Sequence, residues 1–180
     1  MVCYERPRLP IWLPVVRHVH GGQVDKVGRC PAPQCRAEEV PVDFDEALAL
    51  AEEHHGEQTD KAGHPYMGHI RRVVDAVDSP QAKLAAALHD IVEDTHMTAE
   101  RLVALDCPPE VVRAVEALTR REGEDYETFV ARAAKDPIAR VVKRADVADN
   151  GDKSRLALLP PIQADRLRAK YARAAEILDF

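Results

Sequence analysis

A histidine and three carboxylates stand within six residues near the middle of this sequence: His89, Asp90, Glu93 and Asp94. Apolar residues precede them, so His89 and Asp90 are expected on a largely buried helix, with both later acids one turn further along the same face. A carboxylate buried without a partner is energetically costly, and a metal ion is one partner that removes this cost. These residues alone leave two interpretations open, a metal site or a solvated acidic helix end.

Two other segments carry residues of the same kinds. Asp146 follows an apolar run, and Lys143 and Asn150 share its helical stripe, while His69 stands in a separate segment. Each has an ordinary alternative, since Lys143 and Asp146 could form a plain ion pair and His69 could be a core or surface histidine. Together, two imidazoles and two carboxylates suit Mn²⁺, Fe²⁺, Co²⁺ or Zn²⁺ better than Ca²⁺ or Mg²⁺. Such an ion would acidify a water molecule and polarise a phosphoryl group.

Helices are expected to position these residues. The sequence is only 4% aromatic and is rich in alanine and leucine, which favours helix over sheet. Capping residues mark several helix starts, among them Asp43 or Asp45, Ser79 and Thr98. The predicted helices begin near residue 43 and end before Gly56, then cover 65–77, 81–93, a short segment from 98, 109–119, 124–135, 137–149 and 162–178. No segment alternates convincingly with period two, so the predicted fold class is all-α.

The length of the chain and its net charge limit the classes of protein to which this sequence can belong. A chain of 180 residues suits one domain, which we expect over residues 42–180. The formal net charge of −6 argues against a protein that holds long nucleic acid, but it is compatible with a small anionic substrate. No apolar run is long enough to span a membrane or to serve as a signal peptide, so we expect a cytoplasmic protein.

Residues 1–41 have a different composition. They are rich in proline and show no sustained helical period, which predicts a poorly ordered arm. Cys30 and Cys35 follow two histidines and could be imagined as a zinc site, but their spacing is irregular and reduced thiols are the favoured interpretation. Residues 20–28 match residues 55–63 at six of nine positions, which we interpret as a fragmentary duplication or a coincidence.

Three blocks of sequence resemble the hydrolase domains of RelA/SpoT-type alarmone enzymes and the small alarmone hydrolases. They occur in the same order and with similar spacing as in that family, within about residues 44–178. One such block would be weak support, whereas three in register are strong. The blocks are HGEQ at 55–58 with Lys61, Tyr66 and His69, then HDIVEDT at 89–95, then KRADVADN at 143–150.

This resemblance implies an all-α HD-domain helical bundle that removes the 3′-pyrophosphate of guanosine 3′,5′-bis(diphosphate) (ppGpp) to give GDP and pyrophosphate. It also implies one divalent metal ion, with Mn²⁺ as the first candidate. Glu93 and Asp94 would be the catalytic acids that orient or activate the attacking water. The implied metal ligands are His69, His89, Asp90 and Asp146.

The resemblance further implies a set of substrate contacts. Lys61 and Asn150 would contact the nucleotide and its phosphates, and Tyr66 falls within the same motif. Lys143 or Arg144 would help Lys61 to stabilise the negative charge that develops during hydrolysis. The partner implied by these residues is a small anionic nucleotide.

One position departs from the family pattern. Asp60 stands where these hydrolases usually carry an arginine that is associated with the guanine base. A carboxylate cannot stack as a guanidinium does, and it would repel phosphate. Asp60 therefore keeps open an HD phosphohydrolase of another nucleotide or phosphoester, such as a nucleoside monophosphate or NADPH. Two further alternatives are a non-catalytic nucleotide-binding HD module and a purely structural helical protein. Because the sequence ends at Phe180, no synthetase domain is expected.

Overall fold

The computed structural model describes residues 42–180, and every structural statement below concerns that part of the chain. The predicted N-terminal arm, the cysteine pair Cys30 and Cys35 and the partial repeat at 20–28 lie outside the described residues. The division of the chain at residue 42 therefore stays a prediction.

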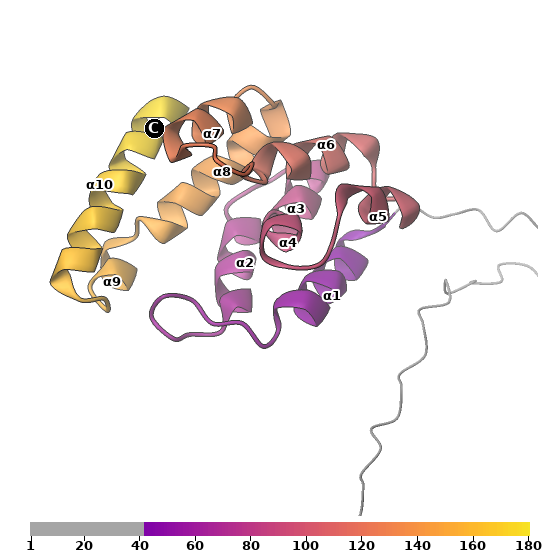
Figure 1. The fold of residues 1–180 in the computed structure, drawn as a ribbon. Helices are drawn as coiled ribbons and strands as arrows, with labels where there is room; N and C mark the ends of the chain where they lie inside the picture. Colours follow the sequence, from indigo (N-terminus) through magenta and orange to yellow (C-terminus); the bar gives the residue numbers. More distant parts are fainter. Residues whose placement is uncertain (1–41) are drawn as a thin grey trace, which may run out of the picture. The chain divides into compact units, whose positions relative to one another are not determined.

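The described residues form helices and no named strand, as Figure 1 shows. The all-α expectation is confirmed, and one isolated antiparallel bridge between Thr59 and Pro65 closes the loop after the first helix. None of these helices is long and apolar enough to cross a bilayer. In chain order they are α1 (Phe44–His55), α2 (Tyr66–Asp75), α3 (Pro80–Ala87), α4 (Ile91–Asp94), α5 (Ala99–Ala104), α6 (Pro109–Leu118), α7 (Tyr126–Ala133), α8 (Pro137–Asn150), α9 (Lys153–Leu156) and α10 (Pro161–Leu178).

The helix starts follow the local sequence signals. The side chain of Asp43 accepts a hydrogen bond from the Glu46 amide, and the Glu46 carboxylate accepts one from the Asp43 amide, which forms a capping box. Ser79 and Thr98 likewise cap α3 and α5. The short helix α9 was not predicted, although Asp152 caps it in the same way.

Helix α3 lies at the centre of the packing. It contacts α1, α2, α6 and α8, and five of its eight residues are buried alanines or leucine. Small side chains let the surrounding helices approach closely, which brings α2 and α8 together on one side of α3 (Figure 1). A second apolar cluster joins α7, α8 and α10. The packing around α3 and α8 therefore sets the relative positions of the predicted site residues.

His89 and Asp90 do not lie on a continuous helix, and this prediction was wrong. Helix α3 ends at Ala87, and a tight turn that includes a hydrogen bond from the Ile91 amide to the Leu88 carbonyl leads into α4. The His89 side chain explains the break: its Nδ1 lies 2.8 Å from the Ala86 carbonyl oxygen, the acceptor that a continuous helix would offer to the Asp90 amide. At this point the chain forms a turn that buries the His89 imidazole, in place of a regular turn of helix.

The crowding around α3 can be tested by enlarging one of its alanines. Ala85 is fully buried, so Ala85→Leu should lower the free energy of unfolding by about 1–3 kcal/mol through overpacking. The measurement is urea denaturation followed by circular dichroism. Gln81→Leu, on the exposed side of the same helix, is the matched control and should change stability by less than about 0.5 kcal/mol. Equal stability of both variants would contradict the packing described here.

Candidate metal centre

Four predicted ligands come together from three parts of the fold. His69 lies on α2, His89 and Asp90 lie in the turn before α4, and Asp146 lies on α8. Ligand atoms of His69, His89 and Asp90 all lie within 4.8 Å of one another. The fourth predicted ligand, Asp146, adjoins His69, whose Nε2 atom is 3.4 Å from an oxygen of Asp146.

The two imidazoles are oriented as metal ligands would be. The Nδ1 atom of His89 faces the Ala86 carbonyl at 2.8 Å, and that of His69 faces a carboxylate oxygen of Asp149 at 2.6 Å. Since both partners only accept hydrogen bonds, each Nδ1 donates its proton to them, and each Nε2 faces a carboxylate, that of His89 at 2.8 Å from Asp90. Both Nε2 atoms are buried and make no hydrogen bond. Unpaired buried nitrogens next to two carboxylates fit a divalent metal ion.

The carboxylates of Asp90 and Asp146 are held by polar neighbours. The Tyr66 hydroxyl donates to Asp90, while Asn150 Nδ2 donates to Asp146 at 2.5 Å. The Lys143 ammonium lies 2.8 Å from the other Asp146 oxygen, and both side chains are buried. The pair is therefore not the exposed ion pair considered from the sequence, because the low dielectric strengthens it and makes loss of either partner costly.

Glu93 and Asp94, on α4, line a cavity of about 290 Å³ beside the predicted metal ligands. Burial raises the pKa of both carboxyls above their ordinary values. One Glu93 oxygen also accepts a hydrogen bond of 2.9 Å from the Arg120 amide. A carboxyl with a raised pKa is better suited to take and return a proton near neutral pH.

The cavity brings together all the predicted substrate contacts except one. Lys61, Tyr66, Lys143 and Asn150 line it, together with Asp90 and Asp146. The exception is Arg144, whose guanidinium lies over the Phe180 ring at 5.0 Å and which does not line this cavity. Because Arg144 follows Lys143 directly on α8, the two side chains diverge by about 100° around the helix.

Several cavity residues were not found from the sequence. Arg120 lies between α6 and α7, Tyr126 begins α7, Arg155 lies on α9 and Lys170 lies on α10. None of them belongs to a motif with recognisable spacing, so no local signal separates them from ordinary surface residues. His55 is also buried, its Nε2 has no hydrogen-bond partner, and its ring lies 5.4 Å from that of Tyr66.

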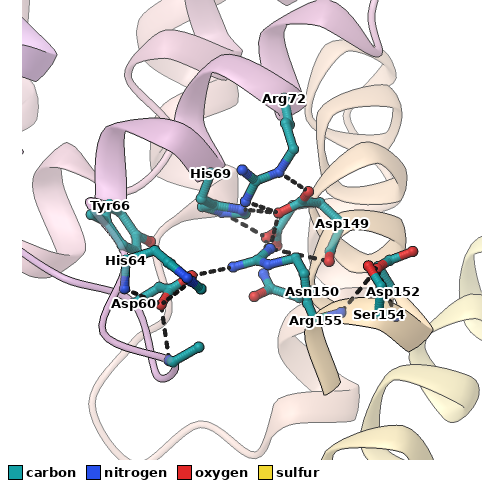
Figure 2. A network of polar contacts seen from close by, with 12 residues as sticks. Asp60, His64, Tyr66, His69, Arg72, Asp149, Asn150, Asp152, Ser154 and Arg155 are labelled. Atoms are coloured by element: carbon teal, nitrogen blue, oxygen red, sulfur yellow. Dashed lines mark hydrogen bonds and ion pairs between the residues drawn. The ribbon is translucent and has the colours of Figure 1, made fainter. Parts of the chain in front are cut away.

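Asp60 does not project an unpaired negative charge, which corrects the expectation that it repels phosphate. One oxygen accepts hydrogen bonds from the amides of Ala62 at 2.8 Å and His64 at 3.0 Å. The other lies 3.0 Å from the guanidinium of Arg155, as Figure 2 shows. Burial would raise the Asp60 pKa, but these bonds outweigh it and lower the pKa below its ordinary value. The Asp60 carboxylate thus stabilises its own loop through two backbone amides and binds the guanidinium of Arg155.

Asp149 connects this loop to the metal centre and was missed by the sequence analysis. Its carboxylate accepts from His69 Nδ1, from Arg72 Nε at 2.5 Å and from Arg155 (Figure 2). Asp149 comes three residues after Asp146, a spacing that could have suggested a shared helix face. Through Arg155 and Asp149, the loop residue Asp60 and the predicted ligand His69 belong to one polar network.

Relatives by sequence are alarmone enzymes, although no protein-family model matches the chain. The guanosine-3′,5′-bis(diphosphate) 3′-pyrophosphohydrolase of Aquifex aeolicus is 30% identical over 116 residues, which is 58% of this chain and 16% of that protein. A probable GTP pyrophosphokinase of Mycobacterium leprae is 31% identical over 128 residues, covering 64% and 16% of the two chains. A probable pyrophosphohydrolase of the same kind from Synechocystis is 30% identical over 119 residues, with coverage of 58% and 16%. The chain thus spans about a sixth of the length of these relatives.

A solved structure shows the same likeness. It is that of a metazoan ortholog of SpoT that hydrolyses ppGpp and plays a role in starvation responses. The two structures superpose with a TM-score of 0.65 at 25% sequence identity, over 75% of this chain and 84% of the other. The expected resemblance to RelA/SpoT-type hydrolases is therefore confirmed, in both sequence and fold.

The role of Asp149 behind His69 can be tested by metal affinity. Asp149→Ala removes the acceptor that orients the imidazole, so the affinity for Mn²⁺ should fall by about 10–100-fold. Asp149→Asn keeps an accepting oxygen and should lose less. Calorimetric titration with Mn²⁺ measures the effect, and circular dichroism checks the fold. Asp165→Ala, in an exposed pair with Arg168, is the control. Unchanged Mn²⁺ affinity in a folded Asp149→Ala variant would contradict this role.

Proposed function

We propose that this chain is a metal-dependent phosphohydrolase that removes the 3′-pyrophosphate of ppGpp to give GDP and pyrophosphate. The observation that carries the proposal is the pair of buried, unbonded Nε2 atoms of His69 and His89, which lie beside two carboxylates at the edge of a cavity. Sequence relatives that carry this activity in their names support the choice of substrate.

The proposed ligands of the ion are His69, His89, Asp90 and Asp146, and Mn²⁺ is the first candidate, with Fe²⁺, Co²⁺ or Zn²⁺ as alternatives. A divalent ion at this position would polarise a phosphoryl oxygen and acidify a water molecule. The protein orients these side chains by hydrogen bonds. The Ala86 carbonyl fixes His89, the Asp149 carboxylate fixes His69, and the Tyr66 hydroxyl fixes Asp90.

Glu93 and Asp94 are the proposed proton carriers. Their raised pKa values let one of them take a proton from the attacking water and return it to the leaving group. Lys61 and Asn150 would contact the substrate, and Tyr66, whose hydroxyl is committed to Asp90, would form part of the wall. Lys143 is paired with Asp146, so its proposed part is to hold that ligand.

Cytoplasmic location and the absence of a long nucleic-acid partner stay predictions from the sequence. An HD phosphohydrolase of another nucleotide is the second candidate, because Asp60 stands where the family usually has an arginine. Both candidates use the same proposed metal centre, so a panel of substrates separates them.

The first test is hydrolysis of ppGpp by the purified protein with added Mn²⁺. NADPH and nucleoside monophosphates are assayed alongside. We expect release of pyrophosphate and GDP from ppGpp, and loss of this activity in Asp146→Ala. Cleavage of another phosphoester without turnover of ppGpp would overturn the alarmone assignment and keep the hydrolase. No turnover of any substrate by protein that binds Mn²⁺ would favour a non-catalytic module.

The proton-carrier role makes a separate prediction. Glu93→Gln keeps the shape of the side chain but cannot accept a proton, so the rate constant kcat should fall by roughly 10²–10⁴-fold while Mn²⁺ affinity is retained. Steady-state kinetics and Mn²⁺ titration of the same preparation measure both quantities. Glu122→Gln, an exposed acid outside the cavity, is the control. An unchanged kcat in Glu93→Gln would remove Glu93 from the mechanism.

A further inference from the structure

His55 is a third buried imidazole, and the proposed mechanism does not use it. It is the last residue of α1, it has no exposed surface, and it does not line the cavity. As in His69 and His89, its Nδ1 is in a hydrogen bond and its Nε2 is buried without a partner among residues 42–180. Because burial of a polar ring costs free energy, the hydrogen bond at Nδ1 is the contact that offsets this cost.

Gln58 uses both its side-chain and its backbone groups to join three helices. Its side-chain oxygen lies 2.8 Å from His55 Nδ1, and its side-chain nitrogen donates to the Asp94 carbonyl at 3.3 Å. Its backbone amide donates to the His55 carbonyl at 2.9 Å, and its backbone carbonyl accepts from the Tyr66 amide at 2.9 Å. Gln58 thus connects the end of α1 to the start of α2 and to the end of α4.

These contacts fix the direction in which the side-chain amide of Gln58 faces. Since the Asp94 carbonyl only accepts hydrogen bonds, the NH₂ group of Gln58 must face it, and the oxygen of the amide then faces His55. The Nδ1 atom of His55 therefore carries a proton and donates it to Gln58. The hydrogen bonds run in one direction, from His55 through Gln58 to Asp94.

Helix α4 depends on contacts of this kind because it is only about one turn long. It spans Ile91–Asp94 and carries both proposed proton carriers at its end. Carbonyl groups in the last turn of a helix have no partner within the helix, and Gln58 supplies one for Asp94. The Glu93 carboxylate is fixed separately, by the Arg120 amide. The Asp94 carboxylate forms no hydrogen bond or ion pair with residues 42–180, so its direction depends on where the backbone of Asp94 lies.

We propose that Gln58, held by His55, is a positioning residue for Asp94 in the proposed reaction. By fixing the carbonyl of Asp94, it holds the end of α4 so that the carboxyls of Glu93 and Asp94 face the cavity. Neither His55 nor Gln58 touches the substrate, since neither lines the cavity. This inference rests on the proposed function, but the connection between Gln58 and α4 can be tested without turnover.

Hydrogen exchange in the metal-free protein, followed by NMR, tests this connection. Gln58→Leu removes the donor to Asp94, so the hydrogen-bonded amides of Ile91 and Asp94 should exchange about tenfold faster, the value of one hydrogen bond. Amides of α3 should exchange as before. Gln58→Glu keeps the acceptor for His55 but not the donor to Asp94, and it should give the same result. Gln163→Leu, exposed on α10 and outside the cavity, is the matched control and should behave as the wild type does.

Kinetics of ppGpp hydrolysis separate positioning from a general loss of structure. Gln58→Leu should lower kcat by roughly 10²-fold, the cost of a misplacement of about 1 Å, with KM and Mn²⁺ affinity retained. The rate is expressed per Mn²⁺-binding site, counted by titration, so that unfolded protein does not lower it. His55→Asn keeps a donor near the position of Nδ1 and should retain more activity than His55→Ala.

Wild-type exchange at Ile91 and Asp94 in folded Gln58→Leu and Gln58→Glu would overturn the proposal. A kcat equal to that of Gln163→Leu would overturn it too, as would a fall in Mn²⁺ affinity as large as the fall in kcat. Equal activity of His55→Asn and His55→Ala would contradict the part of His55. If exchange in α4 depends on Gln58 but the wild type does not hydrolyse ppGpp, the proposed function fails and the connection between Gln58 and α4 stands.

Discussion

Two buried imidazoles, each fixed by a hydrogen bond at its Nδ1, constrain the rest of this structure. His69 directs its Nδ1 to the Asp149 carboxylate, and His89 directs its Nδ1 to the Ala86 carbonyl. The second bond interrupts the helix in which the sequence places His89. The backbone therefore departs from regular helix after Ala87, where the imidazole of His89 takes the Ala86 carbonyl as its hydrogen-bond acceptor.

The polar network around Arg155 extends this constraint to the cavity loop. Arg155 is held between Asp149, which orients His69, and Asp60, which caps the loop after α1. Since the Asp60 carboxylate is neutralised there, its presence in place of an arginine changes the shape and charge of the loop less than the sequence suggests. The loop that would contact the substrate and the ligand His69 are thus positioned by the same guanidinium.

The cavity combines two kinds of electrostatic environment. One wall carries carboxylates beside two buried imidazoles, and on another wall Arg120 and Lys170 have no carboxylate within ion-pair distance among residues 42–180. The proposed nucleotide substrate, which is polyanionic, and the proposed metal ion together match both environments. Within the described residues, the charges that remain unpaired are therefore as informative about the ligand as the ion pairs that hold the fold.

The sequence by itself determined the local features of this protein. Caps such as Asp43 and Ser79, proline at helix starts and the absence of strand alternation specify helices, because these effects act within a few residues. Only the tertiary structure decided the rest. Asp149 meets His69 across 80 residues and Arg155 meets Asp60 across 95, and such contacts depend on how α2, α8 and α9 pack. No spacing along the chain encodes those distances, since they arise from side-chain volume and burial summed over the whole core.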